Sequence, residues 1–252
     1  MSSTEDLTRF AKLGFEDFRR LAADTSLSAY EKIGFPNSYR EGKEPLIFAD
    51  ILGKLERLRE PGSTVLDIGP GCSDVPRLLA AHCRQLGQEL HLVDSAEMLD
   101  QLDDGQGVHK HAAFYPECPE LLERLHGRAD AVIVYSVLQY IFVDTNLYKF
   151  LDVTLALLAP GGALLLGDIP NVSMRKRFFS SGTGKTFHKA FTGTDTEPDV
   201  AHHMIERDQI DDAVVFGILQ RARAAGFHAY VLPQPPELPL ANRREDILII
   251  RP

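Results

Sequence analysis

The stretch "VLDIGPGCSD", Val65–Asp74, decides the fold of this chain of 252 residues. Its apolar half predicts a buried strand that ends at Asp67. Gly69-Pro70-Gly71 then predicts a tight turn into a helix whose N-cap is Ser73. Small residues in such a turn let backbone amides approach a ligand closely. The Gly-x-Gly pattern alone is a weak signal, because Asp74 stands where the dinucleotide-binding fingerprint has its third glycine.

A second acidic residue ends the next apolar segment, "ELHLVD". Asp94 follows Gly69 by 25 positions. At this spacing a carboxylate accepts hydrogen bonds from both ribose hydroxyls of an adenosine-containing ligand. The spacing fits an NAD-dependent oxidoreductase as well as a methyltransferase, so these residues alone leave both classes open.

Short apolar runs alternate with amphipathic stretches from Thr64 onward. Such alternation predicts an α/β fold, in which a parallel sheet carries crossover helices on both faces. After a long irregular connection, residues 211–225 predict a helix. "FHAYVLP" and "EDILIIR" then predict two closing strands, of which the last runs antiparallel. Residues before Thr64, including 44–58, predict a helical cap on the sheet.

Composition and charge exclude several classes of protein. The formal net charge of −9 opposes binding to a polyanion, so nucleic acid is not an expected partner. The first residues lack the pattern of a signal peptide, and no apolar run reaches the roughly 18 residues of a membrane span. Cys72, Cys83 and Cys118 have no CxxC spacing and are expected to be reduced thiols. We expect a cytoplasmic protein that does not bind membranes.

Four stretches resemble, in order, the successive motifs of the class I S-adenosylmethionine-dependent methyltransferases: residues 65–74, 90–94, 129–141 and 155–168. The resemblance implies a Rossmann-like seven-stranded sheet of order 3-2-1-4-5-7-6 with strand 7 antiparallel. It also implies S-adenosyl-L-methionine as cofactor, bound across the carboxyl ends of strands one to four. We expect residues 1–60 to form the N-terminal helical cap and residues 61–252 the methyltransferase domain, with residues 170–206 as a lid-like insertion.

The resemblance carries over to particular positions. The turn after the first strand and the end of the second are implied to hold the methionine part and the ribose. The residues after the third strand would edge the adenine, and those after the fourth would lie near the transferred methyl. The implied cofactor-binding residues are Asp67, Gly69, Pro70, Gly71, Cys72, Asp94, Ser95, Met98, Ala113, Phe114, Ser136 and Val137.

Three further stretches, "IGFPNSYREGKEP", "GDIPNVSMRKRFFSS" and "ANRREDILI", resemble methyltransferases of bacterial surface-polysaccharide gene clusters. This narrower resemblance implies a role in polysaccharide biosynthesis.

The tripeptide Gly184-Lys185-Thr186 matches the end of a Walker A phosphate loop. Phe179 stands where that loop needs its first glycine, and the tripeptide lies well beyond the expected fifth strand. A phosphate loop is therefore not expected. We interpret the connection as a lid in which Gly182 and Gly184 supply hinge freedom.

The same connection is basic, with five Lys or Arg and no Asp or Glu between residues 171 and 194. Two interpretations stay open: a solvated segment paired with the acidic remainder, or an anion-binding lid over the methyl acceptor. His188 in this segment is the favoured general base. Tyr140, beside the expected position of the methyl group, is the second catalytic candidate.

The position of the last strand indicates which residues could bind the methyl acceptor. If strand seven is antiparallel beside strand five, its first residues lie at the carboxyl edge of the sheet, where ligands bind. Its arginines would then hold an anionic acceptor, or pair with Glu237, Glu245 or the N-terminal cap and hold the hairpin in place. The candidate substrate-binding residues are Tyr39, Arg40, Gln139, Asp168, Asn171, Arg175, Arg177, Lys185, Arg243 and Arg244. No metal is expected, because Ser136 stands where metal-dependent O-methyltransferases carry a carboxylate.

The sequence thus predicts an S-adenosylmethionine-dependent methyltransferase for a small polar, anionic acceptor, with oxygen as the favoured methylated atom. An NAD-dependent oxidoreductase and a non-catalytic S-adenosylmethionine-binding protein are the alternatives. A small-molecule acceptor is the expected partner, and a homo-oligomer is left open.

Overall fold

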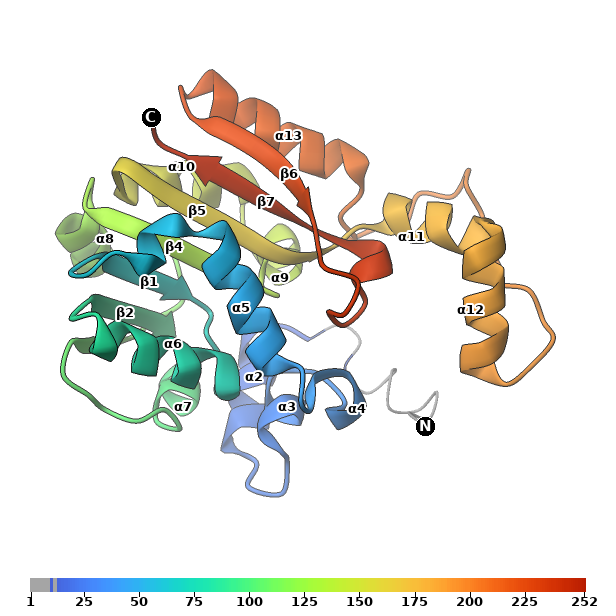
Figure 1. Ribbon diagram of the computed structural model, residues 1–252, viewed down its shortest axis with the longest axis horizontal. Helices are drawn as coiled ribbons and strands as arrows, with labels where there is room; N and C mark the ends of the chain where they lie inside the picture. Colours follow the sequence, from blue (N-terminus) through green and yellow to red (C-terminus); the bar gives the residue numbers. More distant parts are fainter. Residues whose placement is uncertain (1–9, 11–12) are drawn as a thin grey trace.

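The sheet has the topology that the sequence predicts. The structure is a computed structural model that describes residue 10 and residues 13–252. In this part of the chain seven strands form a sheet of order β3-β2-β1-β4-β5-β7-β6, with β7 antiparallel to β5 and β6 (Figure 1). The strands are β1 (Thr64–Ile68), β2 (Glu89–Asp94), β3 (Val108–Ala112), β4 (Ala129–Tyr135), β5 (Leu158–Pro170), β6 (His228–Pro233) and β7 (Arg244–Ile250).

Helices cover both faces of the sheet and bury two apolar clusters. Because side chains alternate along a strand, Leu66 and Val132 face one cluster, whereas Val65 and Ile133 face the other. The helices packed on the first face are α8 (Pro119–Leu125), α9 (Leu138–Asp144), α10 (Leu147–Leu157) and α13 (Asp212–Ala224). Those on the second face are α5 (Glu44–Lys54), α6 (Asp74–Gln85) and the short α7 (Ala96–Leu99). In the described residues no helix is both long and apolar enough to cross a bilayer.

Helix boundaries follow local signals in most places. Ser73 is the N-cap of α6, as predicted, although its side chain makes no capping hydrogen bond. Asp211 caps α13 by accepting a hydrogen bond from the backbone N–H of Val214. The helix expected over residues 44–58 ends earlier, at Lys54, and a 3₁₀ turn, η1 (Glu56–Arg59), replaces its last part.

From residue 13 onward the N-terminal segment contains the short helices α2 (Phe15–Ala23), α3 (Ala29–Lys32) and α4 (Asn37–Arg40). They pack beside the carboxyl ends of the central strands. Arg19 of α2 forms an ion pair of 2.7 Å with Glu97 of α7, and Lys32 donates a hydrogen bond of 2.6 Å to Gln101. Residues 1–9, 11 and 12 of the expected cap lie outside the described residues.

The expectation of an irregular connection after β5 is wrong. Residues 172–192 form two helices, α11 (Val172–Ser180) and α12 (Gly182–Thr192), which extend from the edge of the sheet (Figure 1). Both helices have strong caps: Asn171 accepts hydrogen bonds from two backbone N–H groups of α11, and Ser181 accepts one from Gly184. The Walker-like tripeptide therefore follows a helix, not a strand, which agrees with the prediction that it is no phosphate loop.

Gly184 is a close-packing position, which corrects its expected role as a hinge. A Cβ atom at Gly184 would lie 1.9 Å from the carbonyl oxygen of Phe178. Only glycine lets α11 and α12 approach so closely. The first turn of α12 thus depends on a tertiary contact, which the pattern of apolar residues in the sequence does not predict.

Candidate active site

The turn after β1 brings backbone close to two other segments. Gly69 and Gly71 have positive φ angles of 70° and 66°, a region that favours glycine. A Cβ at Gly69 would lie 2.8 Å from Val137, and one at Gly71 would lie 2.5 Å from Ile33. The turn is therefore packed between the end of β4 and the N-terminal helices.

Asp94, at the end of β2, faces this turn. Its Oδ2 accepts a hydrogen bond of 3.0 Å from the backbone N–H of Gly71, and its Oδ1 accepts one of 2.7 Å from Ser95. Each oxygen keeps a further lone pair for a ligand. Burial raises the pKa of Asp94 to about 6, and the two backbone hydrogen bonds oppose that rise.

Asp67 lies at the end of β1 near Asp94. Burial, with the charge of Asp94 as a second cause, raises the pKa of Asp67 to about 8. At neutral pH Asp94 is therefore the more ionised of the two carboxylates, because burial opposes the charge on Asp67 more strongly.

These groups line a cavity at the carboxyl ends of β1, β2 and β4. All predicted cofactor-binding residues line it except Cys72 and Ser95, which are buried nearby. Ser95 caps α7, and Cys72 packs against Met98, where burial raises the pKa of its thiol to about 11. A thiol with that pKa stays protonated at neutral pH.

The N-terminal helices supply one wall of the cavity, which the sequence prediction missed. Phe15 and Phe18 of α2 line it together with Ile33 and Phe35. Phe15 meets the ring of Phe114 edge-on at 5.0 Å between centroids. The three-residue spacing of Phe15 and Phe18 on an amphipathic helix is the signal that could have indicated an inward-facing aromatic pair.

Asp144 and Thr145, at the end of α9, also line the cavity and were not predicted. Burial raises the pKa of Asp144, and the charge of Asp17 adds to that rise. No sequence motif marks either residue, because their place depends on how α9 packs.

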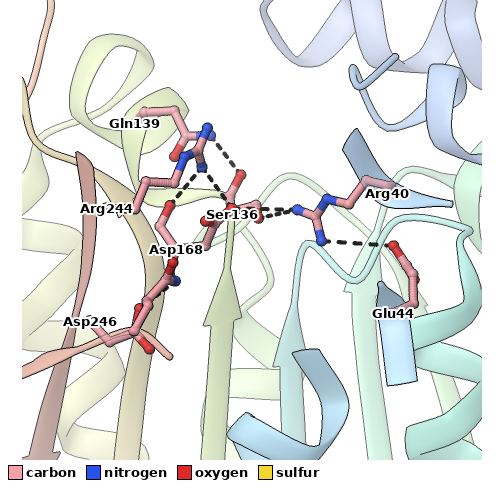
Figure 2. A network of polar contacts seen from close by, with 8 residues as sticks. Arg40, Glu44, Ser136, Gln139, Asp168, Arg244 and Asp246 are labelled. Atoms are coloured by element: carbon pink, nitrogen blue, oxygen red, sulfur yellow. Dashed lines mark hydrogen bonds and ion pairs between the residues drawn. The ribbon is translucent and has the colours of Figure 1, made fainter. Parts of the chain in front are cut away.

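A polar cluster lies at the ends of β4 and β5 (Figure 2), and two of its members, Arg40 and Ser136, line the cavity. Arg40 of α4 donates a hydrogen bond of 2.6 Å to Ser136 Oγ and lies 3.4 Å from Asp168 Oδ2. The same oxygen accepts from Ser136 Oγ, and from Arg244 at 2.7 Å. The prediction that the start of β7 lies beside the end of β5 is confirmed by these contacts and by the pairing of Pro170 with Arg244.

The backbone is strained at both strand ends of this cluster. Ser136 has a φ of 61° and Asp168 a φ of 58°, values that are uncommon for residues with a side chain. Such conformations persist where the surrounding structure imposes them, and they gather at functional sites. Asp168 is further fixed because its backbone N–H donates to Asp246 and its carbonyl accepts from Arg244.

Arg40 is only 3% exposed, which is rare for an arginine. Its charge is balanced by Asp168 and, at 3.7 Å, by Glu44. Glu44 also accepts a hydrogen bond from the backbone N–H of Val75 in α6. Two paired side chains thus join the cap to its neighbours: Arg40 contacts the strand ends, and Glu44 contacts the helix after the glycine turn.

Of the two candidate residues after β4, Tyr140 is among the residues that line the cavity and Gln139 is not. Gln139 donates a hydrogen bond of 2.7 Å to the carbonyl of Ser136, and its buried Oε1 has no partner within the described chain. Tyr140 lines the cavity and meets Phe18 edge-on. Burial raises the pKa of Tyr140, so its phenol keeps its proton at neutral pH and is a hydrogen-bond donor there.

The basic residues of α11 and α12 have acidic partners, which matches the first of the two interpretations left open. Arg175 pairs with Glu206, Lys185 pairs with Glu197 and Arg177 pairs with Asp212. Asn171 is also engaged, since it caps α11 and donates hydrogen bonds to Asp212 and Glu245. These side chains are therefore occupied by contacts within the chain.

His188 lies on α12 against the ring of Phe179. It is not one of the described residues that line the cavity. The structure therefore does not bring the favoured general base to the expected position of the methyl group, because the segment that carries it is a helical extension and not a loop folded over the strands.

Metal ligands do not gather at this site. Over the described residues there is no group of three or more His, Cys, Asp or Glu side chains arranged to hold a metal ion.

No protein-family model matches the chain. No curated protein matches it either. Solved structures with similar folds include the plantazolicin methyltransferase BamL in complex with a triazolic desmethylPZN analog and SAH, with a TM-score of 0.57 and 13% identity over 100% of this chain and 99% of that one. The CurJ carbon methyltransferase has a TM-score of 0.57 and 16% identity over 99% of this chain and 67% of that one.

A SAM-dependent methyltransferase from Aquifex aeolicus is similar as well, with a TM-score of 0.53 and 13% identity over 96% of this chain and 100% of that one. At these identities the likeness establishes the fold. The chain has the Rossmann-like fold of the class I methyltransferases.

Proposed function

We propose that this protein is an S-adenosylmethionine-dependent methyltransferase. Its acceptor would be a small polar, anionic molecule, a sugar- or phosphate-containing metabolite, methylated at oxygen in the cytoplasm. A place in surface-polysaccharide biosynthesis is part of the same proposal and rests on the sequence resemblance alone.

One observation carries the proposal. Asp94 and the Gly69-Pro70-Gly71 turn are joined by a hydrogen bond and together line a cavity at the carboxyl ends of β1 and β2, where ligands bind in this kind of sheet. The free lone pairs of the Asp94 carboxylate suit two ribose hydroxyls. Met98, Ala113 and Phe114 offer an apolar slot of the kind that an adenine ring occupies. The donor set therefore fits S-adenosylmethionine.

The chain would act mainly by alignment. When bound, the cofactor supplies a methyl group that is already activated on its sulfonium. The aromatic wall from α2 would exclude water, and Asp94 would fix the ribose. Ser136, held in its strained conformation by Arg40 and Asp168, would define the floor beneath the acceptor. Holding two reactants at near-attack distance supplies much of such a rate enhancement without a nucleophilic residue.

Tyr140 would orient the acceptor oxygen by donating a hydrogen bond, because its phenol is protonated at neutral pH. An acceptor with negative charge would be held by arginine at this edge of the sheet, where β7 begins. Guanidinium groups suit phosphate and carboxylate because of their planar, forked geometry.

Isothermal titration with S-adenosylhomocysteine and with NADH tests the cofactor. We expect binding of the first and none of the second. Binding of NADH alone would replace the proposal by a nucleotide-dependent oxidoreductase. A mass-spectrometric screen of nucleotide-linked and phosphorylated sugars for a gain of one methyl group would then identify the acceptor, and cofactor binding without any methylated product would favour a non-catalytic role.

A further inference from the structure

Arg243 differs from the other cations at the carboxyl edge of the sheet. It ends the 3₁₀ turn η2 (Ala241–Arg243), directly before β7. Its guanidinium lies 5.5 Å from the ring centroid of Phe179 in α11. Within the described residues the Arg243 side chain has neither a hydrogen bond nor an ion pair with a carboxylate, although it is largely shielded from water.

Each of three other cations at this edge has an acidic partner. Arg244 pairs with Asp168 at 2.7 Å, and Arg175 pairs with Glu206 at 2.7 Å. Lys176 lies 3.4 Å from the same Glu206. Among these four cations, Arg243 is the one for which the described residues offer no carboxylate.

An unpaired cation in this position is costly. Burial lowers the pKa of Arg243; the nearby Tyr39 opposes that effect, and the charges of Arg244 and Arg175 add to it. Arginine does not lose its proton in proteins, so this half-buried side chain keeps its charge. The amide of the preceding Asn242 has spare capacity too, because its Oδ1 is buried without a partner in the described chain. A bound anion would relieve the unpaired charge, and a protonated oxygen on it could donate to Asn242.

We propose that Arg243 is the specificity-determining residue that binds the phosphate or carboxylate group of the methyl acceptor. Its assignment to the acceptor rests on the proposed function. Phe179 would support one face of the planar guanidinium, which leaves the N–H groups at its edges free for two parallel hydrogen bonds to one anionic group.

Arg243 is not among the residues that line the cavity, although its neighbour in sequence is linked to the cavity wall. Arg244, next in sequence, contacts Asp168, and Asp168 contacts Ser136 in the cavity wall. The anionic group and the methylated atom would therefore belong to different parts of the acceptor, as in a sugar that carries its phosphate away from the reacting hydroxyl. The cations of α11 and α12, being paired, would not take part in this recognition.

The test uses inorganic phosphate as the probe. The full chain and its R243M variant are titrated with phosphate by calorimetry, with chloride at equal ionic strength as the reference. R221M is the matched control: Arg221 also lies over an aromatic ring, 5.8 Å from that of Tyr148, but it pairs with Asp152. Circular dichroism and the melting temperature without phosphate establish that each variant is folded.

We expect phosphate to bind the unchanged chain and R221M alike, and R243M at least about tenfold more weakly. R243K should fall between them, since it keeps the charge and loses the fork. Equal phosphate affinity in R243M and R221M, or no phosphate binding by the unchanged chain, would overturn the proposal. S-adenosylhomocysteine is titrated separately, because its failure to bind would refute the proposed function and leave the phosphate result standing on its own.

Discussion

Replacing Asp94 by asparagine removes the charge at the end of β2 while keeping the size of the side chain. Two backbone N–H groups now donate to the carboxylate, and the ribose of S-adenosylmethionine is expected to add two hydroxyl donors. The asparagine amide has one accepting oxygen and would set its NH₂ group against a donor. We expect a folded variant with weaker cofactor binding.

The size of the effect follows from the kind of hydrogen bond that the substitution removes. Hydrogen bonds to a charged group contribute about 1.5–3 kcal/mol. That range corresponds to a rise of about 10- to 150-fold in the dissociation constant of S-adenosylhomocysteine. Calorimetric titration at pH 7.5 measures it directly, with Asp152→Asn as the matched control, because Asp152 pairs with Arg221 on the surface.

The pKa of Asp94, about 6 in the free protein, adds a pH signature. The cofactor is expected to bind the ionised carboxylate, so a proton competes with it. Affinity should be level above about pH 7 and fall below pH 6, reaching about one tenth at pH 5 because only about a tenth of the chains then carry the charge. Asp94→Asn should abolish this slope. An unchanged dissociation constant, or the same slope in Asp94→Asn, would refute the role of this carboxylate.

Three further substitutions test the packing and charges around the site. Asp67→Asn should raise the melting temperature of the free protein, because the folded state raises the pKa of Asp67 from 3.8 to about 8 and so opposes its ionisation. The difference in melting temperature from the unchanged chain should grow between about pH 4 and pH 8 and stay constant above about pH 8. A difference that does not depend on pH would contradict this. Gly184→Ala should lower the free energy of unfolding by about 1–3 kcal/mol through overpacking, whereas Gly182→Ala, with open space at its Cβ, should change it little; equal effects in urea titrations would exclude the close contact. Arg40→Met should lower the free energy of unfolding by about 3–5 kcal/mol, because it leaves buried carboxylates without a cation. A decrease below about 1 kcal/mol would show that the ion pair with Arg244 is enough to stabilise Asp168.

The sheet could be predicted well because the sequence marks its strands directly and resembles a family whose strand order is known. Short apolar runs ending in Asp67 and Asp94 mark buried parallel strands, and the resemblance supplied the order of the remainder. Once the sheet was right, the meeting of Arg244 with Asp168 followed from topology alone.

The basic segment after β5 was harder to predict. Its sequence contains Gly182 and Gly184, which are poor helix formers, and its cations suggested a ligand. Helix α12 forms because Ser181 caps it and because Gly184 lets it pack on Phe178. Neither effect produces a periodic pattern of apolar residues in the sequence. The acidic partners of its cations come from residues beyond position 194, which pattern reading cannot assign.

The contacts between the N-terminal cap and the sheet limit how this protein can be truncated. The side chain of Arg40 and the wall formed by Phe15 and Phe18 come from the first 40 residues, yet they complete a cavity whose floor belongs to the strands. A fragment that begins near residue 61 would carry the same sheet with an exposed apolar trough in place of the cavity. A chimera that exchanges this N-terminal segment between related chains should therefore transfer or destroy the site as a whole. To keep the site intact, the segment has to be exchanged together with the ends of β4 and β5.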